Sequence, residues 1–129
     1  MKCLRSDWIE PVWMVGIEDS PGIQRARDLG LKTSTDGIDG LMAGWNDRPV
    51  EFVFDATSAA AHADHSQKVV ERGALMIDLT PAAIGPYCIP PVNLDAVLSD
   101  EATRNVNMVT CGGQATIPMV RAVSRVQPL

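Results

Sequence analysis

Short apolar runs alternate along this chain with longer segments in which apolar residues recur at helical spacing. Several of the runs end in an acidic residue, as strands buried on both faces of a sheet often do. Ser20-Pro21 is a typical helix start, and Gly30 and Gly73 are typical residues after a helix end. The pattern predicts strands over 12–17, 31–35, 51–55, 74–79 and 106–110, and helices over 21–29, 37–45, 59–72 and 117–126.

Strands separated by helical segments are typical of βαβ units with right-handed connections. We therefore expect an α/β fold with a doubly wound parallel sheet that helices cover on both faces. Ligands of such sheets bind beyond the carboxyl ends of the strands, so the residues that follow each strand are the first candidates for a site.

Prolines modify this pattern in two places. The prolines and the glycine of residues 81–91 predict a long ordered loop, crossed at most by a short helical turn. Pro118 lacks an N–H group, so the last regular helix should begin at or after about Ala115. Gln114 and Ala115 would then belong to a turn around the thiol of Cys111.

Composition excludes several classes of protein. With 129 residues, 46% hydrophobic and 21% charged, the chain has room for one ordered domain. A net charge of −5 without a basic cluster argues against a nucleic-acid partner. No apolar run reaches the ~18 residues that a membrane span needs, so no membrane association is expected. Three cysteines without a C-x-x-C pair argue against disulfides and a metal site, and they favour a cytoplasmic protein.

Cys111 is the strongest candidate for chemistry. A β-branched strand brings it to a carboxyl end, and Gly112 and Gly113 follow at once. N–H groups of a following turn lower a thiol pKa from ~8.5 to between ~3.5 and ~7.5, and they can also hold an oxyanion. The pattern fits a reactive thiolate about as well as a small buried hydrophobic residue.

An acidic pair follows the first predicted strand. The acid after the second strand of a dinucleotide fold accepts hydrogen bonds from the ribose, and Glu18 or Asp19 stands in that position. A carboxylate there favours NAD over NADP. The glycine-rich fingerprint that should precede this strand is absent, and so is the strand before it. The strands at 12–17 and 51–55 would then each lack a neighbour, so we expect this chain to be a piece of a longer protein.

Five runs of the sequence together resemble one family: LRSDW (4–8), MVGIE (14–18), FVFDATSA (52–59), IDLTPAAIGP (77–86) and VNMVTCGGQATIPMV (106–120). They resemble the acylating acetaldehyde dehydrogenases that accompany 4-hydroxy-2-oxovalerate aldolases in the meta-cleavage of aromatic compounds. The resemblance covers almost the whole chain. It implies a Rossmann-like domain that converts acetaldehyde or a short aldehyde, coenzyme A and NAD to acyl-CoA and NADH.

The resemblance also implies roles for single residues. Cys111 matches the family's nucleophile, which carries the acyl group as a thioester. Glu18 stands where the family usually has an aspartate at the NAD ribose, and Thr57 and Ser58 close a strand that passes close to the cofactor. Residues 1–129 would form a partial NAD-binding domain that carries the nucleophile. The glycine-rich loop, the general base and the substrate and dimerisation domain would lie outside them, and family members are homo-oligomers.

Other polar and apolar residues have plainer interpretations. His62 and His65 are expected on a solvated helix face, and Asp55 and Asp78 in turns or caps. Cys88, like Cys3, is expected to be structural. Three methionines are expected in the core and three tryptophans in packing at the sheet margin: Met76, Met108, Met119, Trp8, Trp13 and Trp45.

Two other functions are compatible with parts of the pattern. One is a catalytically inactive remnant, or an interaction module of the same fold. The other is a cysteine acyltransferase that does not use nicotinamide, but no His or Asp pattern near Cys111 supplies its base. We expect the isolated chain to bind NAD poorly and to show negligible turnover.

Overall fold

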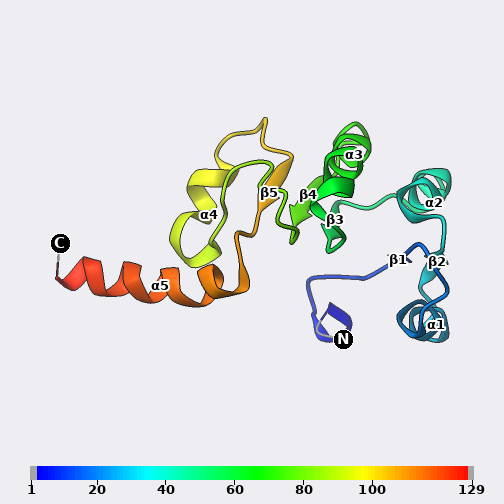
Figure 1. Ribbon diagram of the computed structural model, residues 1–129, viewed down its shortest axis with the longest axis horizontal. Helices are drawn as coiled ribbons and strands as arrows, with labels where there is room; N and C mark the ends of the chain where they lie inside the picture. The colour runs from blue at the N-terminus through cyan, green and yellow to red at the C-terminus, as the bar shows by residue number, and fades with distance from the viewer. Residues whose placement is uncertain (1–2, 128–129) are drawn as a thin grey trace. The chain divides into compact units, whose positions relative to one another are not determined.

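The computed structural model describes residues 3–127, which form two compact units that divide between Val50 and Glu51 (Figure 1). Each unit contains a parallel sheet with helices packed against it. Strands and helices alternate along the chain, so the predicted α/β, Rossmann-like fold is confirmed. Among the described residues, no helix is both long enough and apolar enough to cross a membrane.

The first unit is built around two short parallel strands. A 3-10 helix, η1 (Cys3–Arg5), precedes them. Strand β1 (Trp13–Val15) pairs with β2 (Lys32–Ser34), and helix α1 (Pro21–Asp28) connects the two strands. Helix α2 (Gly37–Gly44) follows β2 and packs on β1.

Capping and burial hold these helices on their strands. The Ser20 Oγ accepts a hydrogen bond from the N–H of Ile23 at 3.4 Å, and Pro21 occupies the first turn of α1, where its missing N–H costs nothing. The core of the unit consists of four residues with at most 7% of their surface exposed: Ile23, Ala26, Leu41 and Trp45.

The second unit contains a three-stranded parallel sheet. Its order is β3-β4-β5, so each strand lies beside the next one in the chain. Phe52 lies opposite Leu75, and Met76 lies opposite Asn105. The elements are β3 (Phe52–Asp55), α3 (Ala59–Val70), β4 (Leu75–Asp78), α4 (Pro90–Leu98), β5 (Asn105–Asn107) and α5 (Cys111–Val126).

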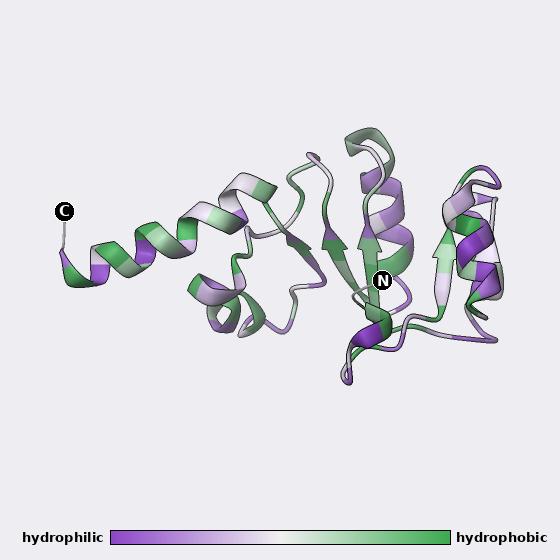
Figure 2. Cartoon of the chain, turned by 90° about the horizontal axis from the view of Figure 1, so that it is seen from below, coloured by the Kyte–Doolittle hydropathy of each residue, from purple (hydrophilic) through white to green (hydrophobic). Residues whose placement is uncertain are grey.

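Burial in the second unit centres on β4. Met76 is fully buried, as is Val69 on the α3 helix that covers this strand. A second cluster joins Cys88, Val97 and Val106, with Leu75, Ile77 and Met108 packed against it. In Figure 2, β3 and β4 are coloured mainly as hydrophobic, whereas green and purple alternate along α5. No residue of α5 is buried among the described residues.

Strands β1 and β3 each pair with a single neighbour within the described residues. One edge of each strand therefore carries backbone groups without a strand partner. On β3, the side chains of Phe52 and Phe54 are 53% and 50% exposed, and Met14 on β1 is 44% exposed. These are the two strands for which the sequence predicts a missing neighbour.

The structure differs from the predicted elements at two helix starts. Helix α4 begins at Pro90, inside the loop predicted over 81–91, because Pro90 and Pro91 occupy its first two positions, where proline is tolerated. Helix α5 begins at Cys111 and includes Pro118, although the expected start was about Ala115. The Thr110 side chain caps the first turn and marks the helix start at Cys111, and Pro118 lies further along, inside the helix.

Two predictions about large side chains also need correction. Trp8 is 95% exposed and Met119 is 69% exposed, so neither belongs to a core. The remaining residues fit better: Met76 and Trp45 are buried, and the Trp13 indole N–H donates to the carbonyl oxygen of Arg48 at 3.0 Å.

Gly85 and Gly73 give a matched test of local packing in the second unit. Both have a positive φ, +80° and +82°, so alanine should cost about 1–2 kcal/mol at either position. A Cβ at Gly85 would also overlap the carbonyl oxygen of Asn105, whereas a Cβ at Gly73 meets nothing within 4 Å. Urea unfolding should therefore show a larger loss of stability for Gly85→Ala than for Gly73→Ala. Equal losses would contradict the observed packing of the 79–89 loop on β5.

Candidate functional site

Cys111 is an exposed residue in the first turn of α5. Thr110 precedes the helix in an extended conformation, with φ −148° and ψ 161°, and its Oγ1 accepts a hydrogen bond from the N–H of Gly113 at 2.9 Å. The N–H groups of Cys111 and Gly112 have no acceptor within the helix, because the first turn offers none. These donors and the helix dipole favour negative charge at this end of α5.

The two glycines after Cys111 have different roles. A Cβ at Gly113 would lie 3.1 Å from the Val109 side chain and 3.2 Å from the Thr110 hydroxyl, so this position is tightly packed. A Cβ at Gly112 would meet only the Thr110 hydroxyl, at 3.9 Å. Gly112 therefore leaves open space beside the thiol, and Gly113 lets the first turn of the helix pack closely on the preceding turn.

The turn between β5 and α5 is strained and firmly held. Val109 has φ 63°, a left-handed conformation that costs a β-branched residue about 1–3 kcal/mol. Its N–H donates to the Asn107 Oδ1 at 2.7 Å. The Gln114 side-chain amide donates to the carbonyl oxygens of Cys88, at 2.6 Å, and Met108, at 2.9 Å. Cys111 is thus presented from a turn whose shape surrounding groups fix.

A buried polar cluster lies under the carboxyl ends of β3 and β4. His62 on α3 is 0% exposed, and its Nδ1 lies 2.9 Å from the Asp55 Oδ2. Its Nε2 lies 3.0 Å from the Asn105 Nδ2 and 3.4 Å from the Asp78 Oδ2. His65 Nδ1 also lies 2.9 Å from the Asp55 Oδ2. The cluster links both strand ends to α3 and to β5.

The expectation of a solvated His62 is therefore wrong. His62, Ser66 and Val69 are the buried residues of α3, and their spacing of four and three places them on one helix face. This spacing is a signal in the sequence that could have identified the burial, but histidine and serine were interpreted as a polar surface. His65 lies at the border of this face and is partly buried.

The turn prediction for the two aspartates is confirmed, although both are also buried. Asp55 Oδ1 accepts from the N–H of Thr57 at 2.9 Å, and Asp78 Oδ1 accepts from the N–H of Thr80 at 2.7 Å. Burial by itself would raise the pKa of Asp55. The hydrogen bonds from Thr57, His62 and His65 together outweigh burial and hold the pKa below its usual value.

The candidate cofactor residues lie at carboxyl ends of strands, as predicted. Glu18 is exposed in the bend after β1, and its side chain has no hydrogen bond or ion pair with any of residues 3–127. The neighbouring Asp19 instead pairs with Arg27 at 3.1 Å. After β3, the Ser58 Oγ caps α3 by accepting from the Ala61 N–H at 3.3 Å. Glu18 belongs to the first unit, whereas Ser58 and Cys111 belong to the second.

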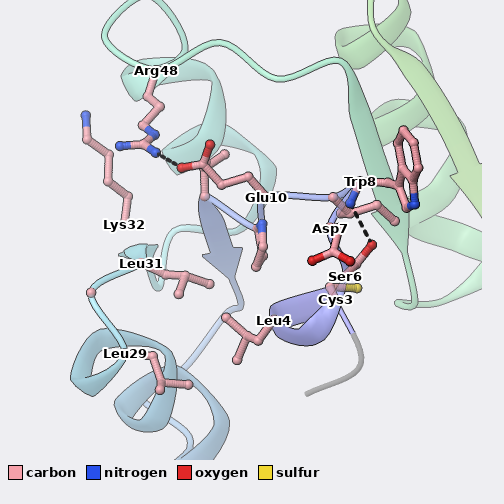
Figure 3. A pocket seen from close by; sticks show the side chains of 14 residues that line it. Cys3, Leu4, Ser6, Asp7, Trp8, Glu10, Leu29, Leu31, Lys32 and Arg48 are labelled. Carbon is pink, nitrogen blue, oxygen red and sulfur yellow. Dashed lines mark hydrogen bonds and ion pairs between the residues drawn. The ribbon is translucent and has the colours of Figure 1, made fainter.

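Two cavities lie at the opposite strand ends. In the first unit, a cavity of about 530 Å³ is lined mainly by the segments before β1 and β2, together with Lys32 and Arg48, and it contains the Arg48–Glu10 ion pair at 2.6 Å (Figure 3). In the second unit, a cavity of about 370 Å³ is lined by Glu51, Arg104 and other residues near the amino ends of the strands. Neither cavity contains a predicted site residue. Within residues 3–127, no group of three or more His, Cys, Asp and Glu side chains is arranged to hold a metal ion.

The fold and the exposed cysteine define a Rossmann-like α/β protein with a candidate nucleophile at a helix N-terminus. Similar proteins include acetaldehyde dehydrogenases of Stutzerimonas stutzeri, 62% identical over 100% of this chain, and Leptothrix cholodnii, 64% identical over 99%. Acetaldehyde dehydrogenase 2 of Comamonas testosteroni is 65% identical over 98% of the chain. Over almost its whole length, the chain is thus similar in sequence to part of the acetaldehyde dehydrogenases, as its resemblance indicates.

The chain spans 41–42% of the length of these relatives. No protein-family model matches it. The similarity therefore covers less than half of each relative.

Asp55→Asn should destabilise the second unit at pH 7 by roughly 2 kcal/mol, because it weakens hydrogen bonds to a buried charged group. Because the folded-state pKa of Asp55 is lowered, its carboxylate stabilises the fold above the unfolded pKa of about 3.9, and this contribution is lost as the pH falls through the folded value. Urea unfolding at pH 7 and pH 3 should show a weaker pH dependence for Asp55→Asn than for the parent.

Asp64→Asn is the control for this comparison. Asp64 pairs with Lys68 at 2.9 Å, but its side chain is 60% exposed, so its loss should change stability little at either pH. If Asp55→Asn and the parent lost stability equally between pH 7 and pH 3, the assigned role of Asp55 would be wrong.

Proposed function

We propose that this chain supplies the nucleophile and part of the NAD-binding domain for the acylating oxidation of acetaldehyde or another short aldehyde. The products are acyl-CoA and NADH. The observation that carries the proposal is the exposed Cys111 thiol at the capped N-terminus of α5, beside the open space at Gly112. The names of the relatives support the aldehyde substrate.

The chemistry follows from the setting of the thiol. The Cys111 thiolate attacks the aldehyde carbon, a C–S bond forms, and the carbonyl π electrons move to oxygen. The N–H groups of Cys111 and Gly112 are the donors available to the resulting thiohemiacetal oxyanion. Bound NAD would supply the hydride acceptor for this carbon, and Cys111 would then carry the acyl group as a thioester. The coenzyme A thiolate then attacks the thioester carbonyl, breaks the bond to Cys111 and restores the Cys111 thiolate.

The residues at two strand ends suit NAD chemically. The exposed carboxylate of Glu18 could accept hydrogen bonds from two ribose hydroxyls, the role that such an acid has in dinucleotide folds. Ser58 uses its oxygen as a cap acceptor and retains its hydroxyl proton for donation. The Thr57 Oγ1 donates to the Asp55 Oδ1 at 2.6 Å, so it remains available only as an acceptor. These residues would hold the cofactor.

The described residues supply no general base next to the thiol. Among them, no His, Asp or Glu side chain forms a hydrogen bond with Cys111, so we assign the base to none of them. We also infer, from the family resemblance, that the complete enzyme is a homo-oligomer that receives its aldehyde from a 4-hydroxy-2-oxovalerate aldolase. Its substrate and dimerisation domain would be additional to residues 1–129.

Acyl transfer to Cys111 can be tested without NAD or a base. Incubation of the chain with acetyl-CoA should acetylate one thiol, because the thiolate attacks the same thioester carbonyl in reverse. Mass spectrometry should locate the acetyl group on Cys111, and hydroxylamine should remove it. Cys111→Ala should abolish this modification, whereas the matched control Cys3→Ala should retain it. The proposal would be contradicted if the acetyl groups were spread over lysines, or if acetylation persisted in Cys111→Ala.

Alkylation gives an independent measure of thiol access. Iodoacetamide should label Cys111 roughly tenfold or more faster than Cys88, because the thiolate is the nucleophile and burial both shields Cys88 and raises its pKa. Cys3, which is partly buried, should react at an intermediate rate. Peptide mapping after timed quenching measures all three rates. Equal labelling of the three thiols in the folded chain would argue against a specially presented Cys111.

A further inference from the structure

Asn107 connects the end of β4 with the turn that presents Cys111. Its side chain is 2% exposed and uses both ends of the amide. The Nδ2 donates to the Asp78 Oδ2 at 3.0 Å, and the Oδ1 accepts from the Val109 N–H at 2.7 Å. The amide orientation is thereby fixed, because Asp78 accepts and the Val109 N–H donates.

The backbone around Asn107 is held as firmly as its side chain. Its N–H donates to the carbonyl oxygen of Pro86 at 2.9 Å, and its carbonyl oxygen accepts from the Cys88 N–H at 2.8 Å. The next residue, Met108, donates its N–H to the carbonyl oxygen of Asp78 at 2.9 Å. Asn107 therefore has little freedom to follow a movement of the turn, so its Oδ1 is a fixed acceptor for Val109.

Val109 transmits this constraint to the helix start. Its positive φ of 63° sets the direction in which the chain leaves β5 and enters α5. A Cβ on Gly113 would lie only 3.1 Å from the Val109 Cγ1, so this side chain packs against the first turn of α5. An unsupported valine would leave the left-handed conformation, and Cys111, two residues further on, would turn away from its present position.

Asp78 extends the constraint into the buried cluster. Its Oδ2, which accepts from Asn107, lies 3.4 Å from the His62 Nε2, and its Oδ1 accepts from the Thr80 N–H. His62 in turn contacts Asp55 at the end of β3. The position of Cys111 is thus tied, through side chains, to the ends of the other two strands of this sheet.

We propose that Asn107 is a positioning residue for Cys111: it holds Val109 in the left-handed conformation that directs the thiol and the first N–H groups of α5 toward the same space. This inference rests on the proposed function of Cys111. It assigns no contact with substrate to Asn107. In this proposal, the buried amide of Asn107, which is hydrogen-bonded to Asp78, determines the reactivity of the Cys111 thiol four residues later.

The test compares two buried asparagines of β5. Asn107→Leu removes the acceptor for Val109, whereas Asn105→Leu removes an amide that bonds to His62 and Ser66 and does not contact the turn. Iodoacetamide labelling of Cys111 should slow by about tenfold in Asn107→Leu and by less than about threefold in Asn105→Leu. Unfolding midpoints measured on the same samples show whether both variants lose similar stability. Equal slowing of Cys111 labelling in both variants would contradict the proposal, because Asn107 would then act only as a buried core residue.

A rescue variant distinguishes positioning from general damage. Glycine adopts a positive φ without strain, so Val109→Gly added to Asn107→Leu should restore much of the labelling rate, to within about threefold of the parent. A purely structural role of Asn107 would not be rescued in this way. Absence of rescue, or an unchanged rate in Asn107→Leu alone, would overturn the proposal.

A second variant covers the case in which Asn107→Leu does not fold. Val109→Pro removes the N–H that Asn107 binds and forces φ to about −65°, while leaving the buried cluster intact. It should slow Cys111 labelling by about tenfold. An unchanged rate would contradict the proposal.

Acetylation by acetyl-CoA, measured in parallel, separates this inference from the proposed function. A parent chain that alkylates rapidly at Cys111 but is not acetylated would count against the acyl-transfer function alone. The ratio of alkylation rates between the asparagine variants would still decide the role of Asn107.

Discussion

The second unit depends on the contacts of the buried His62 side chain, which lies between Asp55 and Asp78. A buried carboxylate is costly unless hydrogen bonds satisfy it, and Asp55 receives such bonds from Thr57, His62 and His65. These partners come from α3 and from the turn after β3. All of their hydrogen bonds to Asp55 can therefore form only when α3 and the strand ends are in one arrangement. The apolar side chains of Val69 and Met76 pack beside these hydrogen bonds, which fix the position of α3 on the strands.

This cluster also links the strand ends at the edge of the sheet that carries the exposed Cys111 thiol. The carboxyl ends of parallel strands are where ligands bind, and loops there are usually mobile. In this protein the ends of β3, β4 and β5 are linked by buried polar side chains, and the turn before α5 is bonded to the last of them, Asn107. Exposure of the sulfur is therefore combined with a fixed backbone, which is the condition for an oriented nucleophile.

The sequence was sufficient for the features that depend on local patterns. Alternating apolar runs predicted the strands and the parallel α/β fold, whereas the glycines after Cys111 left an exposed thiolate and a buried cysteine about equally supported. The start of α5 was missed because the missing N–H of Pro118 was given more weight than the cap at Thr110. The spacing of His62, Ser66 and Val69 signals a buried helix face, but the partner that His62 meets there, Asn105, is distant in sequence. The conformation of Val109 depends on Asn107, whose amide is oriented by the distant Asp78. No local pattern identifies these distant partners.

The Gln114 amide, which donates to the carbonyl oxygens of Cys88 and Met108, has a mechanical consequence. It fastens the first turn of α5 to the segment that leads into α4. The first turn of the helix cannot move away from the neighbouring loop without breaking the hydrogen bond to the carbonyl oxygen of Cys88. A displacement of this turn, which carries Cys111, must therefore carry the segment around Cys88 with it or break that bond.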